Sequence, residues 1–95
     1  MARRIIWSPE ALSDLVAIAT YIERDSEAYA KAVVRRIVER TRKLARFPKA
    51  GRRVPELASD QIREVFVYSY RVIYSISDEQ VTIAAVIHGH RQILP

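Results

Sequence analysis

The chain has 95 residues, of which 49% are hydrophobic, with two glycines and four prolines. This composition supports one apolar core and excludes a long disordered chain, so we expect residues 1–95 to form a single domain. The absence of cysteine excludes a disulfide framework and favours the reducing cytoplasm. The first apolar run, Ile5 to Trp7, is too short for a signal peptide or a membrane span, so we expect a soluble cytoplasmic protein without a membrane partner.

The net charge of +5 is concentrated in one segment. Between Glu27 and Arg46, seven basic residues stand against two acidic ones, so this segment carries the whole excess. Such a stripe favours an anionic partner, either a nucleic acid, an acidic protein or a membrane surface. A solvated helix face explains the same pattern equally well.

The N-terminal quarter predicts a strand followed by a helix. The β-branched and aromatic run from Arg3 to Trp7 is typical of a short strand. Ser8 and Pro9 then mark a helix start, because serine caps orphan backbone amides and proline has its φ preset for the first turn. We expect this helix to end near Arg24 and to bury a stripe with helical spacing: Leu12, Leu15, Ile18, Ala19 and Ile22.

A second helix is predicted from the cap at Asp25 or Ser26 to Phe47-Pro48, where proline ends it. The short connection makes the two helices an antiparallel hairpin. The basic residues lie off the apolar stripe of the second helix, which comprises Ala30, Val33, Val34, Ile37, Thr41 and Leu44.

The C-terminal half predicts a loop and three strands. Residues 48–61 hold two prolines and a glycine and are typical of an ordered loop. Strands are expected at 62–68, 71–77 and 81–88, and their short connections predict antiparallel hairpins. Alternation places Val72, Tyr74 and Ile76 on one face of the second of these strands, and Val81, Ile83, Ala85 and Ile87 on one face of the third. The order β-α-α-β-β-β predicts an α+β fold, an antiparallel sheet with the N-terminal helical hairpin packed on one face.

Short motifs spread over nearly the whole chain form a characteristic combination. They are Trp7-Ser8-Pro9-Glu10-Ala11, Phe47-Pro48 with Gly51-Arg52, the strand Tyr70-Arg71-Val72-Ile73-Tyr74, and the terminal His88-Gly89-His90-Arg91. At this spacing around a helical hairpin, the chain resembles the RelE/ParE toxins of type II toxin–antitoxin systems. The resemblance implies a bacterial or archaeal toxin that needs no cofactor. It also implies a cognate antitoxin that wraps part of its own chain around the toxin, and contact with operator DNA only through that antitoxin.

The resemblance implies one of two activities. RelE-like members cut messenger RNA in the ribosomal A site, whereas ParE-like members inhibit DNA gyrase and lack the nuclease residues. RNA cleavage needs a base, an acid and a cation that stabilises the phosphorane. By motif, the residues that match these roles are Arg71, His88, His90 and Arg91.

Two departures from the nuclease pattern favour a ParE-like protein. The lysine cluster expected before Tyr70 is absent, because that stretch reads Glu64-Val65-Phe66-Val67-Tyr68-Ser69, and no terminal tyrosine follows Arg91. One arginine without partners stabilises phosphoryl charge poorly. We therefore expect a gyrase inhibitor with no catalytic residues. The alternatives are a RelE-like ribosome-dependent mRNA endonuclease, or a non-toxic homologue that acts only within the antitoxin–operator repressor complex.

The residues expected to contact partners are charged or histidine. Arg71 is either a surface strand arginine paired with Glu64 or another carboxylate, or a contact of the target, and the two alternatives stay open. Arg63 has a similar alternative, which is pairing with an acidic neighbour across the hairpin. No metal site is expected, because His88 and His90 have no third ligand nearby. Exposed sheet edges and the outer groove of the helix pair are expected to receive the antitoxin. The target-binding candidates are Arg63, Arg71, His88, His90 and Arg91, and the antitoxin-binding candidates are Arg35, Arg36, Arg40 and Lys43.

Overall fold

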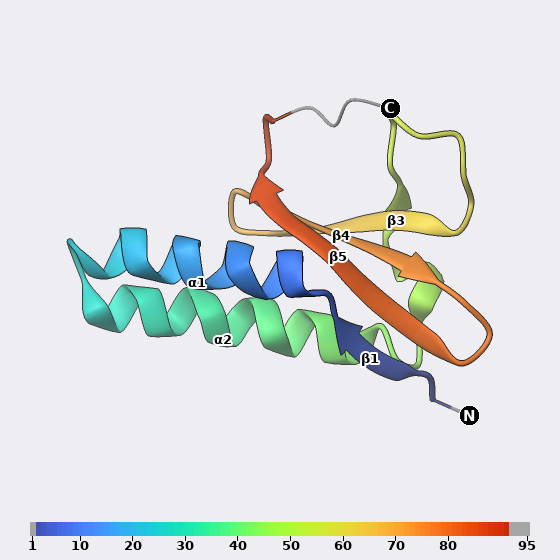
Figure 1. Cartoon of the computed structure of the whole chain (residues 1–95), viewed down its shortest axis with the longest axis horizontal. Helices are drawn as coiled ribbons and strands as arrows, with labels where there is room; N and C mark the ends of the chain where they lie inside the picture. The colour runs from blue at the N-terminus through green and yellow to red at the C-terminus, as the bar shows by residue number, and fades with distance from the viewer. Residues whose placement is uncertain (1, 92–95) are drawn as a thin grey trace.

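Two helices lie against one face of a curled five-stranded sheet in the computed structural model, which describes residues 2–91 (Figure 1). In chain order the elements are β1 (Arg4–Trp7), α1 (Pro9–Glu23), α2 (Glu27–Lys43), the 3-10 helix η1 (Pro48–Ala50), β2 (Arg52–Arg53), β3 (Ile62–Val67), β4 (Tyr70–Ile76) and β5 (Gln80–His88). The predicted α+β class is confirmed, and the predicted helices and strands occur in the predicted order, with η1 and the short strand β2 in addition.

The sheet is mixed, although an antiparallel one was predicted. Its strand order is β1-β5-β4-β3-β2, and β3, β4 and β5 form the expected antiparallel hairpins. At one edge, however, β1 pairs in parallel with β5. No hairpin joins these two strands, so no local signal in the sequence sets their relative direction. At the other edge, the predicted loop contains η1 and the two-residue strand β2, which pairs with β3.

The two helices begin as the sequence predicts. The Ser8 hydroxyl accepts a hydrogen bond from the amide of Ala11, and the Ser26 hydroxyl accepts one from Tyr29. These capping bonds satisfy amides that have no partner within the helix.

The main core lies between the helix pair and the facing side of the sheet. The predicted stripe of the second helix supplies the fully buried residues Val33 and Ile37 of α2 and Leu44, which is the C-cap of α2. The prediction for α1 is wrong at Leu12, which is 49% exposed, because α1 instead turns Ala11 inward beside Leu15, Ile18 and Ile22. The outer surface of α1 therefore keeps exposed apolar side chains.

A β-bulge in β5 changes which residues face the core. Tyr74 pairs with Ile83 and Ile73 pairs with Ala85, so Ala84 is one extra residue in the ladder. The predicted alternation holds for Val81 and Ile83 and is wrong beyond them, where Val86 is the buried residue. The start of α1 satisfies backbone groups at the bulge: the Ser8 hydroxyl donates to Ala84 O, and the Asp14 carboxylate accepts from Val86 N at 2.9 Å.

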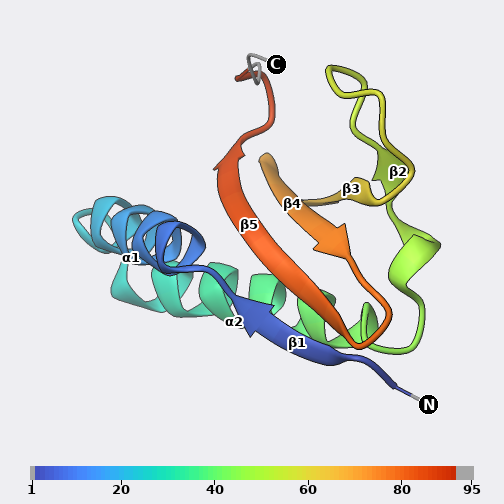
Figure 2. The ribbon, with the colours of Figure 1, turned by 45° about the vertical axis from the view of Figure 1, so that its right-hand side comes forward.

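Tyr74 joins the sheet to the loop that precedes β2. Its buried hydroxyl donates to Pro48 O at 2.6 Å and accepts from Gly51 N at 3.0 Å. A Cβ atom at Gly51 would collide with this hydroxyl and with the carbonyl oxygen of Glu64. Beyond β2, the connection to β3 rises at the same end of the sheet as the end of β5 (Figure 2).

Candidate functional site

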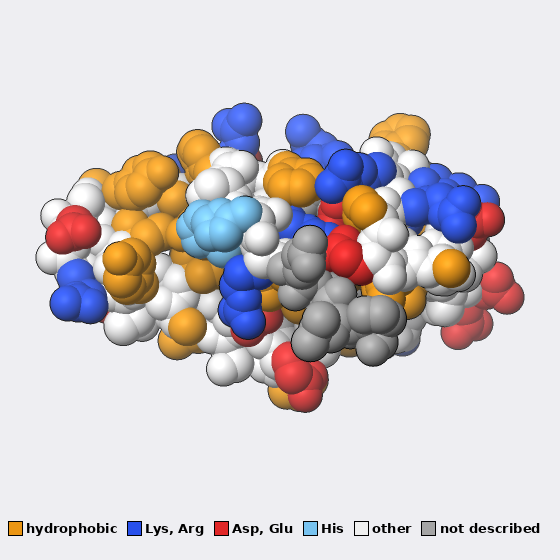
Figure 3. All heavy atoms as spheres, turned by 90° about the horizontal axis from the view of Figure 1, so that it is seen from above, with side chains coloured by type: hydrophobic (Ala, Val, Ile, Leu, Met, Phe, Trp, Pro, Cys, Tyr) orange, Lys and Arg blue, Asp and Glu red, His pale blue; other side chains and the backbone are white. Residues whose placement is uncertain are grey.

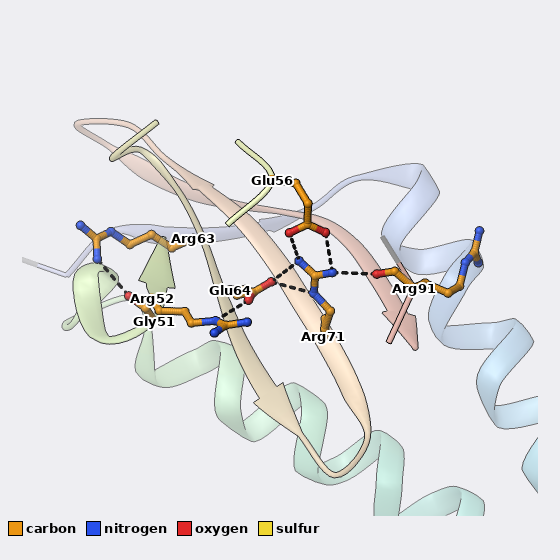
Figure 4. A network of polar contacts seen from close by, with 7 residues as sticks. All are labelled: Gly51, Arg52, Glu56, Arg63, Glu64, Arg71 and Arg91. Carbon is orange, nitrogen blue, oxygen red and sulfur yellow. Dashed lines mark hydrogen bonds and ion pairs between the residues drawn. The ribbon is translucent and has the colours of Figure 1, made fainter. Parts of the chain in front are cut away.

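Arg71 lies on the sheet face opposite the helices and is only 4% exposed. Its Nε donates to Glu64 Oε1 at 2.7 Å, and Nη2 lies 2.6 Å from the same oxygen (Figure 4). Nη1 and Nη2 bind the two oxygens of Glu56 at 2.9 and 3.0 Å, and Nη1 also donates to the carbonyl oxygen of Arg91 at 2.7 Å. All five N–H groups of the guanidinium are thus committed within the molecule.

Strand register brings Glu64 to Arg71. Phe66 lies opposite Arg71 in the β3–β4 ladder, so Glu64 is the diagonal neighbour on the same face. Arg52, which is opposite Glu64 across the β2–β3 pair, donates from its Nε to Glu64 Oε2 at 2.6 Å. The Glu64 side chain is fully buried, and both of its oxygens are paired. Of the two alternatives for Arg71, the pairing with Glu64 is the one that the structure shows.

Glu56 is a part of the site that the sequence did not reveal. It belongs to the β2–β3 connection, lies fifteen residues from Arg71 in the chain, and has a side chain that is 19% exposed. Its only sequence signal is an acidic residue after a proline in a loop, which is too common to identify it. We call Arg52, Glu56, Glu64 and Arg71 the arginine–glutamate network.

This network neutralises its own charges, because two arginines face two glutamates. Hydrogen bonding to Glu56 raises the pKa of Arg71, with a further contribution from Glu64, against the opposing effect of burial. The expectation of Arg71 at the surface is wrong, because the Glu56-bearing connection folds over it. Arg71 is therefore not available to a partner in this conformation.

Arg63 is also engaged within the molecule. Its guanidinium donates to Gly51 O and Asp60 O, both at 3.0 Å, and lies 3.9 Å from the Asp60 carboxylate. The side chain is 15% exposed. The expected acidic neighbour is present, but it belongs to the connection before β3 and not to a strand across a hairpin. Arg63 thus positions this connection.

The remaining target-binding candidates lie together at the end of β5. His88, His90 and Arg91 are all exposed, and the two histidine Nδ1 atoms are 3.1 Å apart. The Arg91 carbonyl is held by Arg71, while its guanidinium points away from the network (Figure 4). A groove of about 450 Å³ between α1 and β5 includes His88 and Arg91 in its lining. The expectation that no tyrosine acts as an acid after Arg91 concerns residues 92–95, which lie outside the described residues.

The antitoxin-binding candidates occupy the solvent side of α2. Arg35, Arg36 and Lys43 are exposed and Arg40 is half-buried. Among residues 2–91, none of these four forms an ion pair. Arg35 also borders a groove of about 370 Å³ on the helix pair, where Ala19, Ala30 and Val34 provide apolar lining.

Residues 2–91 show neither a metal-binding cluster nor a membrane-spanning helix. This part of the chain contains no cluster of three or more His, Cys, Asp or Glu side chains placed to hold a metal ion. None of its helices is long and apolar enough to cross a membrane.

The chain resembles one family model and two named proteins over nearly its full length. Residues 5–93 match the family model described as ParE toxin of type II toxin–antitoxin system, parDE. The chain is 34% identical to "Toxin RelE2" of Caulobacter vibrioides over 89 residues, which is 93% of this chain and 97% of that protein. It is 35% identical to "Putative toxin Y4kP" of Sinorhizobium fredii over 92 residues, or 95% and 92% of the two chains.

Solved structures share this fold. A chain of the chromosomal ParDE toxin–antitoxin system from P. aeruginosa matches with a TM-score of 0.75 at 19% identity, covering 92% of this chain and 96% of that one. The YoeB dimer from Staphylococcus aureus matches with a TM-score of 0.60 at 19% identity, covering 93% and 98%. The YoeB–YefM complex from the same organism gives a TM-score of 0.57.

Proposed function

The chain belongs to the ParE toxin family of type II toxin–antitoxin systems, and from this premise we propose that it inhibits DNA gyrase by binding, without catalysis of its own. As a toxin of this class it has a cognate antitoxin as its partner. The observation that supports the gyrase proposal is the burial and pairing of Arg71. The strand arginine that would stabilise a phosphorane is buried and bound to two glutamates.

An energetic comparison supports binding over cleavage. To reach an RNA phosphate, Arg71 has to leave Glu56 and Glu64, and Glu64 is fully buried. Separating one member of a buried ion pair costs about 3–5 kcal/mol. A nuclease needs its cation preorganised at the reacting phosphate, so that reorganisation opposes catalysis.

A second candidate function is ribosome-dependent cleavage of messenger RNA. It is favoured by the exposed group at the end of β5, where two imidazoles and the Arg91 guanidinium lie together. Imidazole suits proton transfer near neutral pH, and arginine suits phosphate. One similar protein also carries the name RelE2. In this alternative, cleavage depends on His88, His90 and Arg91, with Arg71 released from its partners.

We assign the two partners to different surfaces. The target is proposed to contact the exposed end of β5 at His88, His90 and Arg91, since Arg63 and Arg71 are engaged within the molecule. The antitoxin is proposed to use an acidic segment against the solvent side of α2, where Arg35, Arg36, Arg40 and Lys43 carry unpaired charge within the described chain.

The proposal is tested with purified toxin in a gyrase supercoiling assay, run beside a ribosome-programmed mRNA cleavage assay. We expect inhibition of supercoiling and no cleavage. The Arg91→Ala and His88→Ala variants should weaken inhibition at least about tenfold if they are interface hot spots. Lys49→Ala, an exposed cation on η1, is the matched control. Cleavage by the wild type that disappears in the histidine variant would establish the nuclease alternative.

A further inference from the structure

The chain has only two histidines and no cysteine, and both histidines lie together where β5 ends. His88 and His90 are exposed, and Figure 3 shows the histidine side chains, in pale blue, as one cluster on the molecular surface. Their Nδ1 atoms are 3.1 Å apart, whereas their ring centroids are 4.3 Å apart. The nitrogen edges of the two rings are therefore turned toward each other. We call these two residues the histidine pair.

Hydrogen bonds hold the turn that carries the histidine pair. Between the two histidines, Gly89 N donates to Ser69 O at 2.6 Å. The turn is closed by Arg91 N, which donates to His88 O at 3.0 Å, and the next carbonyl, Arg91 O, accepts from the buried Arg71 at 2.7 Å. The backbone is thus fixed before, between and after the two imidazoles, so little conformational freedom remains to be lost when they bind a common ligand.

Gly89 allows the turn to lie this close to the β3–β4 connection. A Cβ atom at this position would lie 2.8 Å from Ser69 O and 3.4 Å from the Phe66 ring. The first distance is too short for a side chain, so any other residue has to shift the turn. Next to it, the Tyr70 ring lies 5.5 Å from the His88 ring and supports it from β4.

The spacing of the two nitrogens is close to that of two ligands on one metal ion. Imidazole nitrogens bind Zn²⁺ at about 2.0–2.1 Å, which places two of them about 3.3 Å apart around a tetrahedral ion. The Nδ1 atoms of the histidine pair need to separate by only a few tenths of an ångström to reach that spacing. Neutral imidazole with its proton on Nε2 presents a lone pair on Nδ1, and imidazole suits zinc, whereas Mg²⁺ prefers oxygen ligands.

We propose that the histidine pair is one half of a zinc site, which the same pair of a second copy of this chain completes. A structural zinc site takes four ligands, and one chain supplies two. Residues 2–91 contain no group of three or more side chains placed to hold a metal ion, so a closed site within one molecule is not available there. Because both imidazoles are exposed, two copies related by a two-fold axis bring four nitrogens to one ion.

The charges around the histidine pair offset each other. The groove between α1 and β5 is lined by His88, by the Arg91 side chain and by the Asp14 carboxylate. Arg91 opposes a bound cation and Asp14 favours it, and the Asp14 oxygen bonded to Val86 N is Oδ2. The ion is therefore held by its four nitrogen ligands and not by a field of negative charge. This chemistry selects a metal that prefers nitrogen.

Pairing through zinc would cover the end of β5 in both copies. This end is also the proposed contact of the toxin with its target, so a zinc-linked pair should not inhibit gyrase. The zinc site itself does not rest on gyrase as the target, because pairing is measured on the toxin alone.

The test uses tag-free toxin and Zn²⁺ as the probe. Calorimetry gives the affinity and the number of ions bound, and sedimentation gives the mass with and without the metal. We expect one zinc ion for every two chains, micromolar or tighter affinity, and a mass that doubles from the 11.0 kDa of one chain. Mg²⁺ should cause neither heat nor pairing, because it prefers oxygen ligands.

Three variants separate a built site from two surface imidazoles. His88→Gln and His90→Gln each remove one ligand and should abolish pairing, with melting temperatures close to that of the wild type because both side chains are exposed. Gly89→Ala keeps both imidazoles and shifts the turn, so its zinc affinity should fall at least about tenfold, as when ligand positioning is lost. Lys49→Ala, an exposed cation on η1, should bind zinc as the wild type does.

Four outcomes would overturn the proposal. They are no zinc binding by the wild type, one zinc ion per chain without a doubled mass, pairing that persists in both glutamine variants, and unchanged affinity in Gly89→Ala, which would make the ion an adventitious one. A zinc-linked pair that still inhibits gyrase would instead refute the end of β5 as the target contact. A zinc-free wild type that leaves gyrase active would refute the proposed target, and the pairing result would stand in either case.

Discussion

Arg71 and Arg91 share a hydrogen bond but belong to two different regions. In the arginine–glutamate network the polar groups are buried and paired, whereas at the end of β5 they are exposed. Arg71 is buried, and each of its donors has a partner within the arginine–glutamate network. Arg91 contributes only its backbone carbonyl to that network, and its guanidinium is exposed beside His88 and His90. We call the arginine–glutamate network the closed region, and it holds the sheet to the β2–β3 connection. We call the end of β5 at His88, His90 and Arg91 the open region, and its hydrogen-bond donors are available to partners.

The comparison explains why one arginine motif does not identify a function. The strand Tyr70-Arg71-Val72 has the sequence expected beside a phosphate-binding face, but the neighbouring glutamates decide what the arginine binds. A charged side chain that is fully paired in a buried site is committed to the fold. In this protein the function is therefore to be sought where charge and aromatic surface remain exposed.

The largest effect is expected from Arg71→Met. This change leaves Glu56 and Glu64 without their shared cation, so the free energy of unfolding should fall by about 3–5 kcal/mol. Chemical denaturation monitored by circular dichroism measures it. The control is Arg52→Met, because Arg52 also pairs with Glu64 but is 60% exposed, and its loss should cost about 1 kcal/mol or less. Equal effects of the two changes would contradict the closed network described here.

A smaller effect is expected from Tyr74→Phe, which tests the contact between the sheet and the loop before β2. Loss of the hydroxyl leaves Gly51 N and Pro48 O without their partner and should cost about 1–3 kcal/mol.

The same variant should change the dependence of stability on pH. Burial raises the pKa of Tyr74 above its ordinary value of 10.0, so the folded state retains the proton more tightly than the unfolded state. The stability linked to this group is present in full below pH 10.0 and is lost as the pH rises through the higher folded pKa. Tyr74→Phe should lose less stability than the wild type over that alkaline range, as measured by urea titrations at successive pH values. An identical alkaline slope in both proteins would exclude Tyr74 as the group responsible.

The smallest effect on stability is expected from Arg91→Ala. The backbone carbonyl that Arg71 binds is retained, and the side chain that is removed is exposed. The free energy of unfolding should change by less than about 0.5 kcal/mol, while partner binding weakens. Parallel denaturation and gyrase assays would separate the two effects. A large loss of stability here would place Arg91 in the closed region and remove the contrast with Arg71.

Much of the fold was predictable from local patterns. The stripe of α2 was predicted correctly because a long amphipathic helix repeats the same signal over several turns. The alternation predicted for β5 is wrong after Ile83, because one extra residue at the bulge reverses the two faces of the strand. No residue pattern around Ala84 predicts the bulge. Leu12 was misassigned because α1 is apolar around much of its circumference, so spacing alone does not select the buried side.

Some residues of the candidate site could also be named from the sequence, and others could not. Arg71, His88, His90 and Arg91 were named as candidates from motifs, and the Arg71–Glu64 pair was one of two alternatives for Arg71. Glu56 was missed. A loop carboxylate has no special pattern until its backbone position is known.

The amino-acid sequence alone determined the α+β class, the helical hairpin, the strand hairpins and the toxin family, since each follows from short-range periodicity or from motifs along the chain. Tertiary structure alone decided that β1 runs parallel to β5, that Glu56 closes over Arg71, and that Tyr68 and Tyr29 meet across the molecule. These pairings join residues distant in the chain. They depend on how packed layers and connections meet in space, and no local pattern encodes that.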